Sequence, residues 1–261
     1  MTAAPAGPWR PTPPRGAETL AGGMEQPDSN AAWIAAYDEA IADAEAPAEM
    51  FPSGNVIDIC NPDPALIVVE DLAHHLSLLT RYNGGCRWMC SVAEHAVLVR
   101  DIVVGYFKRP DLAGAALHHD DHEALLSEII TTLKGEFQPR FDQLAAVIDA
   151  AIATALGLNV EDFHHPIVKS ADAIALAIEA KHLTRSGGRG FRLSDGRLLR
   201  DVVPDPLPVP LRWYGGLPSA RAERVYLNTH RRDQARDLNA RQHGQVIRLA
   251  DFTHDQEPRH G

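Results

Sequence analysis

The sequence predicts an all-α protein, and three observations support this class. Apolar residues recur with the three-and-four spacing of a helix over most of the central chain. The segments rich in Ala, Leu and Ile between about 111 and 184 lack the alternation of apolar and polar residues that is typical of strands. Helical stretches also follow one another with few extended pieces between them, which favours a core of helix packed on helix.

The sequence of 261 residues divides into three parts. Residues 1–50 begin with five prolines among Gly and Ala, so a disordered tail is expected there, followed by a short amphipathic helix near 28–45. Residues 51–186 contain the helical core. Residues 187–261 contain a Pro-rich linker and a basic helix that is predicted to span 219–242. Met24 is a second candidate start codon.

Within the core, short extended pieces are expected at 56–59 and 66–69, where prolines and a glycine interrupt the chain. Apolar spacing then predicts helices near 70–80, 91–107, 111–126, 139–156 and 166–184. In the C-terminal helix, the basic residues fit a solvated face, or else a contact with nucleic acid or with an acidic partner; they are Arg221, Arg224, Arg231, Arg232, Arg236 and Arg241.

Composition restricts the class of function. With 45% hydrophobic and 23% charged residues, the chain is typical of a soluble globular protein, and no apolar run approaches the roughly 20 residues that cross a bilayer. The formal net charge of −10 disfavours binding along a nucleic-acid backbone, although local positive charge can still hold a small phosphate compound. Sparse cysteines (Cys60, Cys86 and Cys90) and the lack of a secretory signal predict a reducing, cytoplasmic location.

Histidine and acidic residues gather in three short segments of the core, each inside a predicted helix: 91–95, 118–123 and 169–173. His95 shares a helix face with the apolar Val92 and Val99. His119 and Glu123 are four residues apart, so they share one face of the next predicted helix. These polar side chains are therefore expected where the core should be.

Two aspartates near the same faces would be costly to bury without a partner. Asp120 lies at the edge of the His119 face, and Asp172 has Ala, Ile and Leu on most sides and no cation next to it in sequence. An unpaired buried carboxylate costs several kcal/mol. Taken singly, His95 fits a hydrogen-bonded core histidine and Asp172 fits a helix cap or a salt bridge. Together, two imidazoles and two carboxylates from three helices can close around one divalent ion, so the combination favours a metal site.

The ordered set of His95, His119-Asp120 and Asp172 resembles the HD-domain metal-dependent phosphohydrolases. It is most similar to the bacterial and phage subgroup that includes 5′-deoxynucleotidases and a deoxynucleoside triphosphohydrolase. The similarity covers about residues 52–185 and implies an HD-domain helical bundle. Four segments carry it: Glu70–His74 through Arg81–Gly85, Ser91–His95, Leu117–Glu123 and Val168–Asp172.

The resemblance implies one divalent ion with four ligands and an acid/base beside them. The mixed set of imidazoles and carboxylates favours Mn²⁺, Co²⁺ or Zn²⁺. Glu123 takes the role of the acid/base that handles the attacking water. The implied ligands are His95, His119, Asp120 and Asp172.

The resemblance also implies residues that contact the substrate. Arg81 matches an arginine that grips phosphate, and Tyr82 stands where the family often has an aromatic ring against the nucleoside. Glu128 replaces the usual Asp of the subgroup as a second acidic residue of the catalytic site. Lys134 is expected to stabilise charge on the phosphorus oxygens together with Arg81. The prolines that the subgroup has between these last two positions are absent here.

The expected reaction is hydrolysis of a nucleotide phosphoester, most simply by a 5′-deoxynucleotidase that releases phosphate from deoxynucleoside monophosphates. Three alternatives stay open: a deoxynucleoside triphosphate triphosphohydrolase, a hydrolase of a signalling nucleotide such as a guanosine polyphosphate, and a non-catalytic HD module. The expected partner is a small nucleotide, without membrane or nucleic acid, and family analogy suggests a homodimer. His118 and His122 fit proton relays, or else supporting or solvent-facing histidines.

Overall fold

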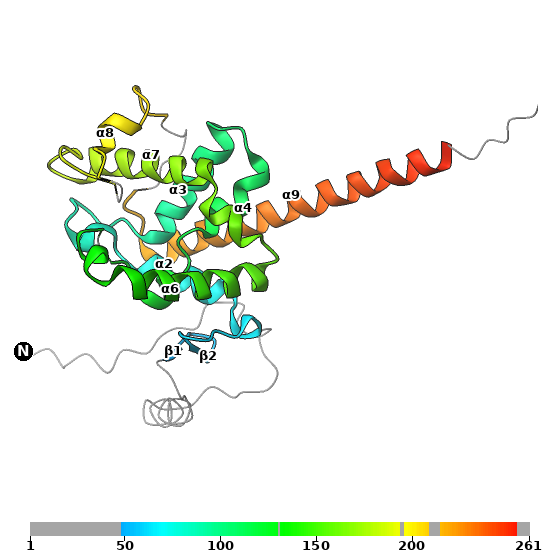
Figure 1. Cartoon of the computed structure of the whole chain (residues 1–261), viewed down its shortest axis with the longest axis horizontal. Coiled ribbons are helices and arrows are strands. Elements are labelled where there is room, and N and C mark those ends of the chain that lie inside the picture. Colours follow the sequence, from blue (N-terminus) through cyan, green and yellow to red (C-terminus); the bar gives the residue numbers. More distant parts are fainter. Residues whose placement is uncertain (1–47, 130, 194–195, 209–214, 255–261) are drawn as a thin grey trace, which may run out of the picture. The chain divides into compact units, whose positions relative to one another are not determined.

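The structure is a computed structural model that describes residues 48–129, 131–193, 196–208 and 215–254; the side chains of 131–138 and 240–254 are not among those described. The expected helix near 28–45 lies outside these residues, as does the expected tail except for its last three positions. Those three positions form strand β1 (Ala48–Met50). The described chain is mostly helical, which confirms the all-α class (Figure 1).

A small sheet precedes the helices. Strand β1 pairs antiparallel with β2 (Val56–Asp58), so that Glu49 lies opposite Ile57. Short 3-10 helices connect the larger elements: η2 (Pro64–Leu66), η3 (Arg81–Gly84), η4 (Pro110–Leu112) and η5 (Val160–His164). The α-helices are α2 (Val69–Leu78), α3 (Val92–Gly105), α4 (Ala113–His118), α5 (Glu123–Leu126), α6 (Thr131–Leu156), α7 (Pro166–Leu183), α8 (Leu199–Val202) and α9 (Ser219–His254).

Helix α3 lies at the centre of the described unit, because it packs against α2, α4, α7 and α9. A capping box starts it: Ser91 Oγ accepts a hydrogen bond from the Glu94 amide at 3.2 Å, and Glu94 Oε2 accepts one from the Ser91 amide at 2.8 Å. One hydrophobic cluster joins α3 to α2, α6 and α9, and a second joins it to α4 and α7. This position fixes His95, in the first turns of α3, deep inside the bundle.

Several predicted helices are confirmed, namely those near 70–80, 91–107 and 166–184 as α2, α3 and α7. The helix expected at 139–156 begins earlier, at Thr131, and holds Pro139 inside it. The extended piece at 56–59 is confirmed as β2. The piece at 66–69 is largely wrong, because Pro64 and the Asp63 cap start η2 and α2 begins at Val69.

The prediction of one continuous helix at 111–126 is wrong. The chain there forms η4, α4, a turn at 119–122 and α5. In the turn, the Asp121 amide donates to the His118 carbonyl at 3.3 Å, and the Glu123 amide donates to the Asp120 carbonyl at 3.0 Å. These three-residue bonds tighten the backbone and end the α-helix. No apolar residue lies between Leu117 and Ala124, so the apolar period does not show where the α-helix ends.

The C-terminal helix α9 begins where the sequence predicts but continues to His254, beyond the expected end at 242. Its first half packs on the core, with Ala222 and Tyr226 almost fully buried. A short helix, α8, lies between α7 and the Pro-rich segment that precedes α9. Arg231 lies 3.4 Å from Glu70 of α2, so at least part of the basic face pairs with acidic residues of this same chain. No helix in the described ranges is long and apolar enough to cross a membrane.

Candidate metal centre

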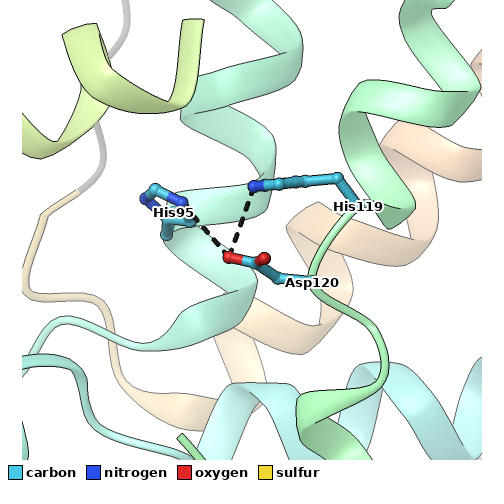
Figure 2. A group of neighbouring side chains, drawn as sticks. All are labelled: His95, His119 and Asp120. Carbon is cyan, nitrogen blue, oxygen red and sulfur yellow. Dashed lines mark ion pairs between the residues drawn. The ribbon is translucent and has the colours of Figure 1, made fainter. Parts of the chain in front are cut away.

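Three of the four predicted ligands converge on one point (Figure 2). Oδ2 of Asp120 lies 3.6 Å from Nε2 of His95 and 3.3 Å from Nε2 of His119. One ligand atom from each of the three residues lies within 4.8 Å of the other two. His95 comes from α3, His119 caps the end of α4, and Asp120 follows in the turn. The break after α4 therefore sits at the cluster itself.

The fourth predicted ligand, Asp172 on α7, contacts the same imidazole. Its Oδ1 lies 3.1 Å from Nε2 of His95. Among the described residues, it falls outside the group whose ligand atoms all lie within 4.8 Å of one another. Its side chain is 45% exposed, against 23% for Asp120. Asp172 thus joins the cluster through His95, on the side that solvent reaches more easily.

The two imidazoles present the same kind of atom to the cluster. Nδ1 of His95 lies 2.8 Å from Glu179 Oε1, and Nδ1 of His119 lies 3.0 Å from the Ala116 carbonyl oxygen. Because both partners are acceptors, each Nδ1 carries the proton, and a neutral ring has its lone pair on Nε2. Both Nε2 atoms are buried, and no acceptor in the described part of the chain meets either with the geometry of a hydrogen bond, although carboxylate oxygens lie 3.1 to 3.6 Å away. This arrangement fits metal ligands that are held by outer hydrogen bonds.

The electrostatics favour positive charge at this point. Burial and the charge of Arg81 oppose protonation of His95, but Glu179 and Asp172 outweigh them and raise its pKa to about 10. Burial raises the pKa of Asp120, but His119 and His95 lower it well below its ordinary value. A divalent ion would supply the positive charge while both rings stay neutral, which is the state in which imidazole binds metals. The donor set fits a borderline ion such as Mn²⁺, Co²⁺ or Zn²⁺.

Glu123 lies beside this group, although it does not share a helix with His119 as the sequence suggested. Glu123 is the first residue of α5 rather than a later turn of the helix that carries His119. Its carboxylate is buried, and one of its oxygens lies within 4.8 Å of ligand atoms of Asp120 and His122. The turn therefore brings Glu123 close to Asp120 without a shared helix face.

The histidines that flank the ligand pair are both buried, so the solvent-facing alternative is wrong for them. His118 is 1% exposed and His122 is 8% exposed. Nδ1 of His118 lies 2.6 Å from Asp121, and Nδ1 of His122 lies 3.0 Å from Asp149 of α6. Each imidazole thus has a buried carboxylate that orients it.

Two residues expected to contact a substrate, Arg81 and Tyr82, are tied to the predicted ligand His95 through Glu179. Nε of the buried Arg81 donates to Glu179 Oε2 at 2.9 Å, and the Tyr82 hydroxyl lies 3.2 Å from the same oxygen. Nη1 of Arg81 lies 3.6 Å from Glu128 Oε1. Burial raises the pKa of Glu128 even though Arg81 opposes this. Lys134 belongs to α6, but its side chain lies outside the described residues.

Glu179 is a residue of the site that the sequence pattern did not lead us to single out, although its position on α7 could have indicated it. It follows Asp172 by seven residues, or two helical turns, so both carboxylates lie on one face of α7. Its neighbours Ile178 and Ala180 are apolar and buried. An acidic residue in such a setting is as costly to bury as Asp172, so Glu179 could be singled out on the same ground.

Comparison with known proteins assigns the chain to a family. No protein-family model matches the sequence. The match to the uncharacterized protein RCAP_rcc00048 of Rhodobacter capsulatus is 33% identical over 171 residues and covers 60% of this chain and 86% of the relative. The match to the uncharacterized protein YfdR of Escherichia coli (strain K12) is 35% identical over 134 residues and covers 50% of this chain and 68% of the relative. At these identities and coverages, the chain belongs to the protein family that includes RCAP_rcc00048 and YfdR.

Proposed function

We propose that the protein is a metal-dependent phosphohydrolase of the HD-domain type that acts on nucleotides, most simply as a 5′-deoxynucleotidase. One observation supports the metal most directly: two buried Nε2 atoms, from His95 and His119, face the same oxygen of Asp120 and have no hydrogen-bond partner in the described ranges. The order and spacing of the motifs in the sequence support the HD-domain assignment and the nucleotide class.

A divalent ion would be held by His95, His119, Asp120 and Asp172. When bound, such an ion supplies Lewis-acid chemistry, because it offsets charge on a phosphoryl oxygen and makes water a stronger acid. Glu123 accepts the proton of the attacking water and later returns it to the leaving oxygen of the nucleoside. Its buried place beside Asp120 suits this role, because a proton acceptor must lie within reach of the reacting water.

Arg81 provides positive charge for the phosphate. Its guanidinium already faces Glu179 at 2.9 Å and Glu128 at 3.6 Å, so a phosphate binds through the N–H groups that these carboxylates leave available. A triphosphate would need positive charge beyond that of Arg81, and the divalent ion and Lys134 are the candidates to supply it. We propose the monophosphate as the simpler substrate, with the triphosphohydrolase as the alternative.

The test is a substrate panel. Purified protein is incubated with deoxynucleoside and ribonucleoside mono-, di- and triphosphates under Mn²⁺, Co²⁺ or Zn²⁺, and the products are identified by mass spectrometry. We expect a nucleoside and phosphate from deoxynucleoside monophosphates, with loss of activity in excess chelator and recovery when metal is restored. Release of triphosphate would instead support the triphosphohydrolase alternative. If the protein bound metal but formed no product from any nucleotide, the proposed enzyme activity would be wrong. A non-catalytic binding module would then be the remaining alternative.

A further inference from the structure

Two side chains of the C-terminal helix contact the turn that carries His119 and Asp120. The Tyr226 hydroxyl donates to Oδ1 of Asp121 at 2.6 Å, although 105 residues separate them. Nδ1 of His230 lies 2.9 Å from Nε2 of His118. These contacts attach α9 to the residues on either side of the ligand pair.

The flanking residues also bond to each other across that pair. Nδ1 of His118 donates to Oδ2 of Asp121 at 2.6 Å, and both side chains are almost completely buried. This bridge closes the segment 118–121 around His119 and Asp120, which lie between its two ends. A change in the length or angle of this hydrogen bond would therefore shift the backbone of His119 and Asp120.

The hydrogen bonds of this network are mutually consistent. Asp121 accepts one bond from His118 and one from Tyr226, so His118 keeps its Nε2 as an acceptor for the Nδ1 hydrogen of His230. Burial and the charge of Asp121 raise the pKa of Tyr226 well above its ordinary value, so its hydroxyl stays a donor. Loss of either donor would leave the fully buried Asp121 carboxylate under-satisfied, and the turn would relax to recover a partner.

Helix α9 is itself fixed to α3, the helix that carries His95. The Leu217 amide, just before α9, donates to Glu94 Oε1 at 2.9 Å. Farther along, Nε of Arg100 on α3 donates to Asp233 of α9 at 2.8 Å. One helix therefore contacts two of the three elements that supply the proposed ligands, α3 and the 118–121 turn, and fixes their separation.

We propose that Tyr226 and His230 are positioning residues for the metal site, which hold the 118–121 turn in the shape that brings His119 and Asp120 to His95. This inference rests on the proposed function only in requiring that the cluster binds a divalent ion. The C-terminal helix then contributes to the geometry of the metal site.

The test compares Tyr226→Phe with wild-type protein and with Thr229→Val as the matched control. Tyr226→Phe removes one hydroxyl and keeps the ring. Thr229→Val removes a buried hydroxyl of the same helix that bonds only within α9, to the Val225 carbonyl and Arg232. Affinity for Co²⁺ is measured by competition with a chromogenic chelator, and the visible spectrum of bound Co²⁺ reports ligand geometry. Thermal unfolding of the metal-free proteins shows that each variant is folded.

We expect Tyr226→Phe to bind Co²⁺ about 10-fold more weakly with an altered spectrum, since loss of an outer hydrogen bond typically costs 10- to 100-fold in metal affinity. Thr229→Val should match wild type in both measurements. Equal affinity and spectrum in Tyr226→Phe and wild type would overturn the inference, and so would an equal loss in Thr229→Val. His230→Gln, which should also weaken binding, decides the matter if Tyr226→Phe does not fold. If the wild-type chain bound no ion, the proposed function itself would fall, and this inference with it.

Discussion

Glu179 of α7 accepts a hydrogen bond from Nδ1 of His95 at 2.8 Å, across 84 residues of sequence. The same carboxylate accepts one from Nε of Arg81 at 2.9 Å, and none of its side chain is exposed. Glu179 therefore sets which nitrogen of His95 carries the proton and directs the other toward Asp120. It also joins the proposed phosphate-binding arginine to the proposed metal ligand.

Replacing Glu179 by Gln should weaken metal binding by roughly 10- to 100-fold. Glutamine keeps the size and an acceptor oxygen, but it removes the negative charge that favours His95 as a ligand and that pairs with Arg81. The measurement is a competition titration with a chromogenic chelator. Glu223→Gln is the control, because Glu223 is a partly exposed carboxylate that also pairs with a histidine, His74, at 3.2 Å. Equal affinities of Glu179→Gln and wild type would contradict the role given to Glu179.

Asp172→Ala should abolish the retention of metal through gel filtration. The substitution removes a carboxylate that lies 3.1 Å from Nε2 of His95 and leaves the fold of α7 intact, since Ala favours helix. Elemental analysis of the eluted protein gives the metal content per chain. Asp111→Ala, which removes an exposed carboxylate paired with Arg109, serves as the control. Full metal content in Asp172→Ala would remove Asp172 from the ligand set.

The helical class and the residues of the cluster could be predicted because both depend on local pattern. The apolar period predicts α3 and α7, and a polar residue such as His95 or Asp172 on an apolar face is visible in the same pattern. The structure brings His95, His119 and Asp120 together, as the sequence led us to expect. Whether these residues bind metal stays a prediction.

The turn at 119–122 could not be predicted from the apolar pattern, because one of the contacts that hold it comes from far away in sequence. The buried Asp121 carboxylate takes a hydrogen bond from Tyr226, 105 residues later, and no local preference encodes that contact. The packing of α9 was hidden for a related reason. Its exposed arginines dominate the sequence pattern, whereas several of its buried positions (Thr229, His230 and Asp233) are themselves polar.

Glu123→Gln should keep bound metal but lose at least about 100-fold in phosphate release, because a positioned acid/base typically contributes a factor of this size or more. Glutamine has the shape of Glu123 but cannot accept the proton of the attacking water. Metal content and single-turnover phosphate release are measured on the same sample. Glu161→Gln, at an exposed carboxylate in η5, should match wild type. Undiminished turnover in Glu123→Gln would exclude Glu123 from catalysis.

The contribution of His230 to the stability of the fold should fall on mild acidification. Burial and the neighbouring His118 lower the pKa of His230 from 6.5 to about 4, although Asp121, Glu70 and Asp233 act in the opposite direction. The unfolded chain takes up this proton near pH 6.5, whereas the folded chain resists it until near pH 4. The contribution of the neutral imidazole is therefore complete above pH 6.5 and is lost as the pH falls through this window. By about pH 5 the loss should be on the order of 2 kcal/mol.

Urea unfolding of wild-type protein and of His230→Gln, in chelator at several values between about pH 7.5 and about pH 4.5, measures this effect. Glutamine does not titrate, so the difference in the free energy of unfolding between the two proteins isolates the imidazole. The free energy of unfolding of wild type should fall relative to that of the variant as the pH falls, and the two curves should run parallel above about pH 7. Parallel curves over the whole range would show that His230 takes up its proton equally well in both states. The neutral state assigned to His230 in the folded protein would then be wrong.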